Sequence, residues 1–187
     1  MSKIKDLFIS SSKEFKNLRN VIVMAMFGAI SIVLGIYLTI MPTETIKISF
    51  TFLPNEFVYY LFGPVAGAFF GAAMDILTFL VRPAGPFFYG FTITAILTGL
   101  FYGIAFYKKP LSLKRIIIAK VIYTLTIDLI LNTYWLTLLY GSGFMAILPM
   151  RIVKAAIMLP VQTILLYTLI RGVEATGILK LLNRKNA

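Results

Sequence analysis

Long runs of apolar residues, separated by short polar segments, dominate the chain from residue 21 onward. About 20 consecutive apolar residues are enough to cross the hydrocarbon core of a bilayer as a helix. The pattern therefore predicts an all-α membrane protein with six transmembrane helices, the second of them short and ended by the helix breaker Gly63-Pro64. The predicted ranges are 21–41, 55–62, 65–81, 91–107, 116–139 and 147–170.

Two of the polar connections have patterns of their own. Residues 42–54 contain a stretch in which polar and apolar side chains alternate, which predicts a short extended segment or hairpin. Residues 82–90 are rich in Pro, Gly and aromatic residues, which predicts a loop. No segment resembles a linker, so we expect a single membrane domain over residues 1–187, with basic segments at 1–20 and 171–187.

Composition supports a membrane protein and disfavours an enzyme. The chain has 187 residues, of which 59% are hydrophobic and only 13% charged, and its mean hydropathy is +0.90. It contains no Cys and no His, which excludes thiolate metal sites and removes the commonest general base. It also has no P-loop motif, so we expect neither an ATPase activity of its own nor a cofactor or metal.

The net charge of +11 is concentrated in three segments that an even number of spans brings to one side. Such a distribution is typical of cytoplasmic segments and does not indicate nucleic-acid binding. We therefore expect both termini to lie in the cytoplasm and the lipid bilayer to be a partner. Lys120 lies in the inner part of the fifth predicted helix, so we expect its side chain to extend to the inner headgroups without a further role. The clusters are Lys3, Lys5, Lys13, Lys16 and Arg19; Lys108, Lys109, Lys114 and Arg115; and Arg171, Lys180, Arg184 and Lys185.

Several ionisable residues lie in or at the edges of the apolar runs, mostly toward the predicted outer side. A charge at the bilayer centre costs about 2.5–3.5 kcal/mol, so such residues usually face a cavity or a partner. Three of the six are cations, which predicts an outward-facing pocket for an anionic solute. The six are Glu56, Asp75, Arg82, Asp128, Arg151 and Lys154.

The spacing of the cations suggests how they would act. Arg151 and Lys154 are three residues apart and share a helix face. Arg binds a carboxylate through two N–H groups, and Lys supplies a point charge beside it. Two other interpretations remain open: this pair holds the helix at the headgroups, and Arg82 forms an ion pair with Asp75 on the same predicted helix.

Polar residues on the fifth predicted helix suggest recognition of a ring. Asp128 and Asn132 lie four residues apart on one face and offer the donors and acceptors that match the edge of a heterocycle. A structural bridge between Asp128 and Lys154 is the alternative. Trp135, the one tryptophan, is either a residue of the interfacial belt or an aromatic wall of the pocket.

Small residues recur at intervals of four, which allows helix backbones to approach closely. Ala25 and Ala29 do so on the first predicted helix. Each pair alone predicts only packing within the bundle. The other repeats are Gly63, Gly67 and Gly71, and Gly99 and Gly103.

The sequence over about residues 21–170 resembles the substrate-binding S component of energy-coupling factor (ECF) vitamin transporters, most closely the folate-specific one. Five segments carry the resemblance, together with the short second predicted helix. They are Phe52-Leu53-Pro54, residues 60–67 (YLFGPVAG), 71–75 (GAAMD), 86–92 (PFFYGFT) and 148–154 (LPMRIVK).

The resemblance implies a six-helix fold in the plasma membrane of a bacterium, with the vitamin held near the outer face. It implies lids at residues 42–54 and 82–89. It also implies that Ala25 and Ala29 form the Ala-x-x-x-Ala motif that docks on a transmembrane coupling subunit, itself served by two ATP-binding-cassette ATPases.

Folate suits the pocket predicted from the charges. Arg82, Arg151 and Lys154 would neutralise its glutamate tail, and Asp128 and Asn132 would bind its pterin, with Asp75 nearby. The candidates for stacking on its rings are Phe50, Phe88, Tyr89 and Trp135.

Other functions remain open at this point. The same fold could carry riboflavin or pantothenate, whereas cationic thiamin would be repelled and neutral riboflavin leaves three cations unexplained. A membrane-embedded enzyme lacks an evident catalytic base, and a proton-coupled transporter acting alone lacks an evident inverted repeat.

Overall fold

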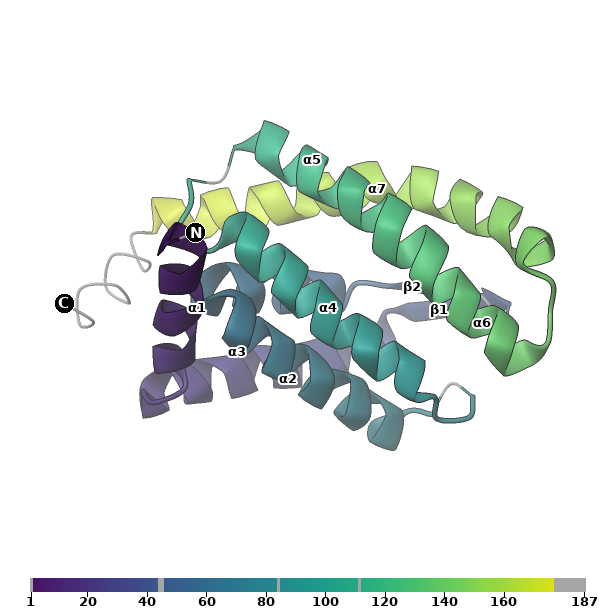
Figure 1. Ribbon diagram of the computed structural model, residues 1–187, viewed down its shortest axis with the longest axis horizontal. Coiled ribbons are helices and arrows are strands. Elements are labelled where there is room, and N and C mark those ends of the chain that lie inside the picture. Colours follow the sequence, from purple (N-terminus) through teal and green to yellow (C-terminus); the bar gives the residue numbers. More distant parts are fainter. Residues whose placement is uncertain (1, 44–45, 84, 111, 177–187) are drawn as a thin grey trace.

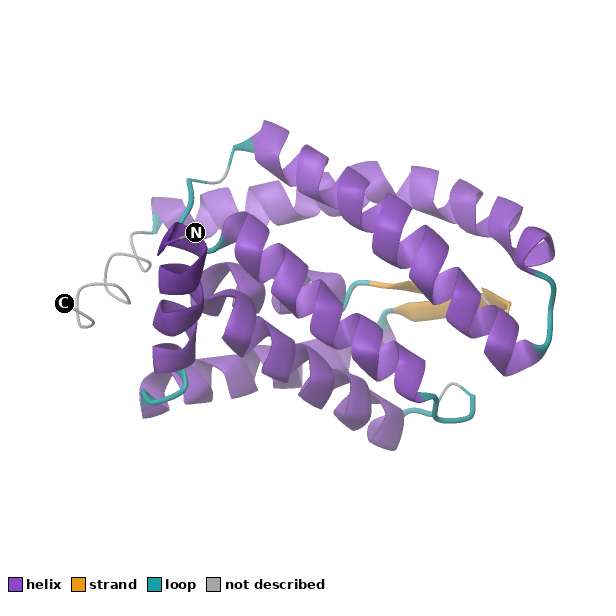
Figure 2. Ribbon diagram, viewed as in Figure 1, coloured by secondary structure: helices purple, strands orange, loops and turns teal. Residues whose placement is uncertain are grey.

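The computed structural model describes residues 2–43, 46–83, 85–110 and 112–176. Apart from one two-stranded antiparallel sheet, the described elements are helices (Figure 2). In chain order they are α1 (Ser2–Glu14), α2 (Leu18–Tyr37), β1 (Thr39–Thr43), β2 (Ile46–Ser49), α3 (Phe52–Val81), α4 (Tyr89–Phe106), α5 (Leu113–Tyr123), the π-helical segment η1 (Thr124–Asn132), α6 (Thr133–Tyr140) and α7 (Phe144–Ala175).

The long helices run along the long axis of the molecule (Figure 1). Helix α1 crosses one end of this bundle, where the α4–α5 connection and the last turns of α7 also lie. We call this the α1 end. The β1–β2 pair and the turn between α6 and α7 lie toward the opposite end, which we call the hairpin end. The basic clusters of α1 and of the α4–α5 connection therefore share one end, as predicted, whereas Lys180, Arg184 and Lys185 lie outside the described residues.

Five helices are long and apolar enough to cross a membrane, counted over the described residues and with α5, η1 and α6 as one. The predicted number of six is not confirmed. The predicted second and third spans are two arms of α3, which joins them at a break. The predicted extended segment or hairpin is confirmed by β1 and β2, where Ile40 pairs with Ile48.

The break in α3 lies at Gly63, whose φ of 83° and ψ of −168° only glycine adopts without strain. The adjoining Pro64 cannot donate a backbone hydrogen bond. The Oγ of Ser11 on α1 satisfies the interrupted backbone, donating to the Phe62 carbonyl over 2.6 Å and accepting from the N–H groups of Val65 and Ala66 over 3.0 and 3.1 Å. Ser11 is fully buried there, so the N-terminal helix is part of the packed structure.

Helix α1 lies within the basic segment at residues 1–20, for which the sequence pattern predicted no helix. Besides Ser11, Glu14 holds it in place by accepting hydrogen bonds from Asn20 over 2.6 Å and from the Tyr107 hydroxyl over 2.8 Å. Phe15, just after the helix, packs edge-on against Phe69. Lys5, Lys13 and Lys16 project to the exposed side.

The second arm of α3 and α4 pack through the predicted small residues. A Cβ at Gly67 would lie 2.8 Å from the carbonyl oxygen of Gly99, and one at Gly103 would lie 2.4 Å from the Cα of Pro64. Any larger residue would force the two backbones apart. These glycines therefore pack the bundle, as predicted, whereas Ala25 and Ala29 are exposed on α2.

Candidate functional site: a cavity between the helices

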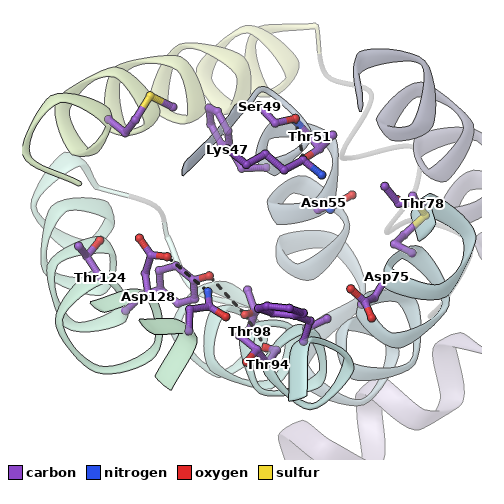
Figure 3. A pocket seen from close by; sticks show the side chains of 18 of the residues that line it. Lys47, Ser49, Thr51, Asn55, Asp75, Thr78, Thr94, Thr98, Thr124 and Asp128 are labelled. Carbon is purple, nitrogen blue, oxygen red and sulfur yellow. Dashed lines mark hydrogen bonds between the residues drawn. The ribbon is translucent and has the colours of Figure 1, made fainter. Parts of the chain in front are cut away.

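A cavity of about 490 Å³ opens among the helices, within the range typical of small-molecule sites. Polar side chains enter it from β2 and the first arm of α3, from the second arm of α3, from α4, and from η1 (Figure 3). Its lining includes Arg82 and Tyr140, where α3 and α6 end toward the hairpin end, and also Tyr102 in the second half of α4, the half that leads to the α1 end, and Gln162 in α7. We call the part around Arg82 and Tyr140 the mouth of the cavity and the part around Tyr102 and Gln162 its floor.

The floor contains a buried ion pair. The Lys120 Nζ lies 2.7 and 2.8 Å from the two carboxylate oxygens of Glu56, and the side chains are 1% and 5% exposed. Gln162 accepts a third hydrogen bond from Lys120 over 3.3 Å, and the rings of Phe52 and Tyr102 lie about the ammonium group at 5.0 and 5.6 Å. The expectation that Lys120 reaches the headgroups is therefore wrong, because its partners lie inside the bundle.

One wall of the cavity carries a second pair. Arg151 Nη2 donates to Asp128 Oδ1 over 2.7 Å and to the Asp128 carbonyl over 3.0 Å. Asn132 donates to the same Oδ1 over 3.3 Å. The structure thus brings these three predicted site residues together, and Asp128 forms its ion pair with Arg151 and not with Lys154. Asp128 and Asn132 lie in η1, and π-helical segments are often found at functional sites.

The mouth is rich in cations that have no carboxylate partner among the described residues. Lys47, Arg82 and Lys154 line it, and none forms an ion pair within the described part of the chain. Arg82 donates instead to the carbonyls of Gly35 and Ile36, where α2 ends. Asp75, the one acid at the mouth among the described residues, accepts a hydrogen bond from Thr92 over 2.7 Å and not from Arg82.

The surroundings of Lys47 at the mouth lower the pKa of its amino group. The larger cause is loss of water around it, and the second is the positive charge of Arg82. Asp75 partly opposes this effect. An anion that entered the mouth would meet these cations and relieve their mutual repulsion.

The predicted stacking residues do not line the cavity. Phe50, Phe88, Tyr89 and Trp135 are absent from its lining, and Tyr89 is 76% exposed. Trp135 is near it, because its Nε1 donates over 3.1 Å to Thr94, which does line the cavity. The aromatic rings in the lining belong to Phe52, Tyr59, Phe79, Phe91, Tyr102, Tyr123 and Tyr140.

The sequence model of the family described as "ECF transporter, substrate-specific component" matches residues 19–170, which is most of the chain. This chain belongs to that family. As an S component it is the substrate-binding part of a transporter and not an enzyme.

Individual relatives agree with the family assignment. The S component is 36% identical to "Folate transporter FolT" of Clostridium novyi (strain NT), over 81% of this chain and 88% of the relative. It is 30% identical to the protein of the same name from Leuconostoc mesenteroides, over 82% and 85%. The solved structure "Crystal structure of FolT bound with folic acid" superposes with a TM-score of 0.76 at 33% identity, covering 82% of this chain and 93% of that one.

Sequence reasoning missed several residues that line the cavity of this S component. Asn55, Thr94, Thr98 and Gln162 are uncharged and lie in apolar runs, so they lacked the signal that a buried charge gives. Lys47 carried a usable signal, since it is one of two basic residues in the predicted outer loops, but we had placed it in a lid and not in the site.

Proposed function

We propose that this S component binds folate in the cavity described above and delivers it to the other subunits of an ECF importer. The observation that carries the proposal is the distribution of charge along the cavity. A mouth where Lys47, Arg82 and Lys154 form no ion pair with a described residue suits a dicarboxylate tail, and a floor without net charge suits an uncharged ring system. The names of the relatives, which are folate transporters, support the same ligand.

The size of folate sets the affinity that we expect. Folate has roughly 30 non-hydrogen atoms, and about 0.3 kcal/mol for each gives about 9–10 kcal/mol, or a dissociation constant on the order of 100 nM. In our proposal its glutamate meets Lys154, Lys47 and Arg82 at the mouth. Its aromatic parts lie deeper, along the wall formed by Arg151, Asp128 and Asn132. Riboflavin, which is neutral, would leave the cations of the mouth unused.

The transport step needs partners, and α2 offers a surface for one. We propose that Ala25 and Ala29, which are exposed on α2, dock on a transmembrane coupling subunit that works with two ATP-binding-cassette ATPases. Small exposed residues at this spacing permit close contact between helices.

We also propose that the α1 end faces the cytoplasm of a bacterium, because basic residues gather there. The cavity mouth then opens outward. The first arm of α3 is too short to cross the bilayer, and counting it separately gives six embedded helices in one membrane domain.

Two measurements on the purified chain test the proposal. Native mass spectrometry would detect a co-purifying ligand of folate mass. Titration of folate into the detergent-solubilised protein, followed by calorimetry and by Trp135 fluorescence, should saturate well below 10 µM. The indole reports on the cavity through its hydrogen bond to Thr94. Absence of saturable binding below about 10 µM would exclude folate as the ligand, and the chain alone should hydrolyse no ATP.

A further inference from the structure

Two polar atoms in the cavity have no hydrogen-bond partner among the described residues. They are the hydroxyl of Tyr102 on α4 and the Oδ1 of Asn55 in the first turns of α3. Tyr102 is only 1% exposed, and both atoms are shielded from water. A buried polar group without a partner costs about 1–3 kcal/mol, and native proteins rarely leave one unsatisfied without a reason.

The neighbouring polar groups at the floor, in contrast, are satisfied by the protein. Both oxygens of Glu56 accept from Lys120, which also donates to Gln162. The Tyr123 hydroxyl accepts from Thr98 over 3.4 Å. The two unpaired atoms are thus an exception within a floor that is otherwise internally bonded.

We propose that Asn55 and Tyr102 form a specificity site that binds the N–H-bearing edge of the heterocycle of the ligand. This inference rests on the proposed function and assigns the part of the cavity that reads the ring. The Asn55 oxygen can only accept, so it requires an N–H donor from the ligand, and the Tyr102 hydroxyl can donate or accept. The pterin ring carries such N–H groups.

Both residues are held in place before the ligand arrives. Asn55 precedes Glu56, whose pairing with Lys120 fixes this turn of α3 against α5. The Tyr102 ring stacks on Phe106 with centroids 5.3 Å apart and packs against Tyr123 at 4.9 Å. Groups that are already positioned lose little entropy on binding, which favours selective recognition.

The test compares single substitutions with two ligands. Tyr102→Phe and Asn55→Ala are titrated with folate and with p-aminobenzoyl-glutamate, which has the tail and the benzene ring of folate but no pterin. Each variant should bind folate about tenfold more weakly, the effect of one lost hydrogen bond at a buried site. Binding of p-aminobenzoyl-glutamate should change by less than about twofold, since that ligand makes no such bond.

Tyr107→Phe is the matched control. Tyr107 is equally buried, at 2% exposed, but its hydroxyl donates to Glu14 at the α1 end and does not line the cavity. It should therefore leave the affinity for both ligands unchanged.

Unaltered folate affinity in both cavity variants would overturn the inference while leaving folate as the ligand. Equal losses for both ligands would also overturn it, because they would show a general disturbance of the cavity. Wild-type protein that binds neither ligand would instead contradict the proposed function. If thermal unfolding shows that Tyr102→Phe is misfolded, Asn55→Ala, which changes a side chain nearer the surface, decides alone.

Discussion

At the floor of the cavity Lys120 meets both oxygens of Glu56, whereas at the mouth Lys47, Arg82 and Lys154 line the opening without an ion pair in the described part of the chain. Both regions place cations in an apolar bundle. The difference lies in what neutralises the positive charge. At the floor a carboxylate from another helix of the same protein does so, and at the mouth no carboxylate of the described residues does.

The comparison separates charges that hold the fold from charges that await a ligand. A buried cation must be compensated, and compensation within the protein makes it structural. A cation left uncompensated near an opening attracts an anion from solution. Arg151 lies between these cases, because it lines the cavity and is already bound to Asp128.

The largest expected effect is on the stability of the floor. Lys120→Met leaves Glu56 buried without its cation, which should lower the free energy of unfolding by about 3–5 kcal/mol. The double variant Glu56→Leu with Lys120→Met removes both charges and should recover most of this loss. Thermal unfolding in detergent measures both. A Lys120→Met protein as stable as the wild type would show that the pair does not support the fold.

At the mouth, a smaller effect on affinity is expected. Lys154→Met should weaken folate binding by about 1–2 kcal/mol, discounted for its half-exposed position. Pteroate, which lacks the glutamate, should be nearly indifferent to the change. Lys114→Met, an exposed lysine before the cavity-lining part of α5, is the control and should alter neither ligand. Equal losses for folate and pteroate by calorimetry would make Lys154 structural.

The pH dependence of binding should report on Lys47. Its ammonium form attracts an anion, so its contribution to folate affinity is complete below its pKa and is lost as pH rises through it. Because desolvation and Arg82 lower that pKa, this loss should begin at a lower pH than for an ordinary lysine. Comparing wild type with Lys47→Met between pH 7 and 10 isolates the effect, because titration of the ligand itself is common to both. If folate affinity falls with pH in parallel for wild type and Lys47→Met, the titration of Lys47 does not contribute to binding.

The smallest expected change in affinity concerns α2, which lies outside the comparison of floor and mouth. Ala25→Trp or Ala29→Trp changes an exposed side chain away from the cavity, so folate affinity of the isolated chain should stay within a few fold. Uptake by cells that hold the coupling subunit and the ATPases should nevertheless collapse, because Trp prevents close helix contact. Normal uptake in both variants would place the docking surface elsewhere.

The apolar runs predicted most of the helices, and the small-residue repeats predicted close packing within the bundle, which the structure places between α3 and α4. They did not predict α1, because its first half mixes Lys5 and Asp6 with apolar residues and a polar Ser run follows. That helix depends on tertiary contacts: Ser11 and Glu14 find their partners 51 and 93 residues away in the chain. Contacts of this kind leave no periodic trace in a sequence.

The candidate site was only partly predictable for a related reason. Buried charges stand out in an apolar run, so Arg82, Asp128, Arg151 and Lys154 were expected to share one pocket, and all four line the cavity. Their pairing was not expected, because Arg151 and Lys154 share a helix face and either fits Asp128 by spacing. Lys120 was misjudged because its partner Glu56 lies 64 residues away. Three of the four aromatic residues, Phe50, Phe88 and Tyr89, were chosen from predicted loops, whereas the rings that line the cavity lie mainly within helices.

The cap that Ser11 places on the broken helix also has a consequence for biosynthesis. Ser11 leaves the ribosome 51 residues before Phe62, whose carbonyl it binds. The hydroxyl that completes the interrupted backbone is therefore already made when the break emerges, and α3 need not insert with bare peptide groups facing lipid. Deleting the first helix would leave the later chain chemically intact, yet the turn at Gly63 would have to find water or another donor and acceptor at the membrane surface.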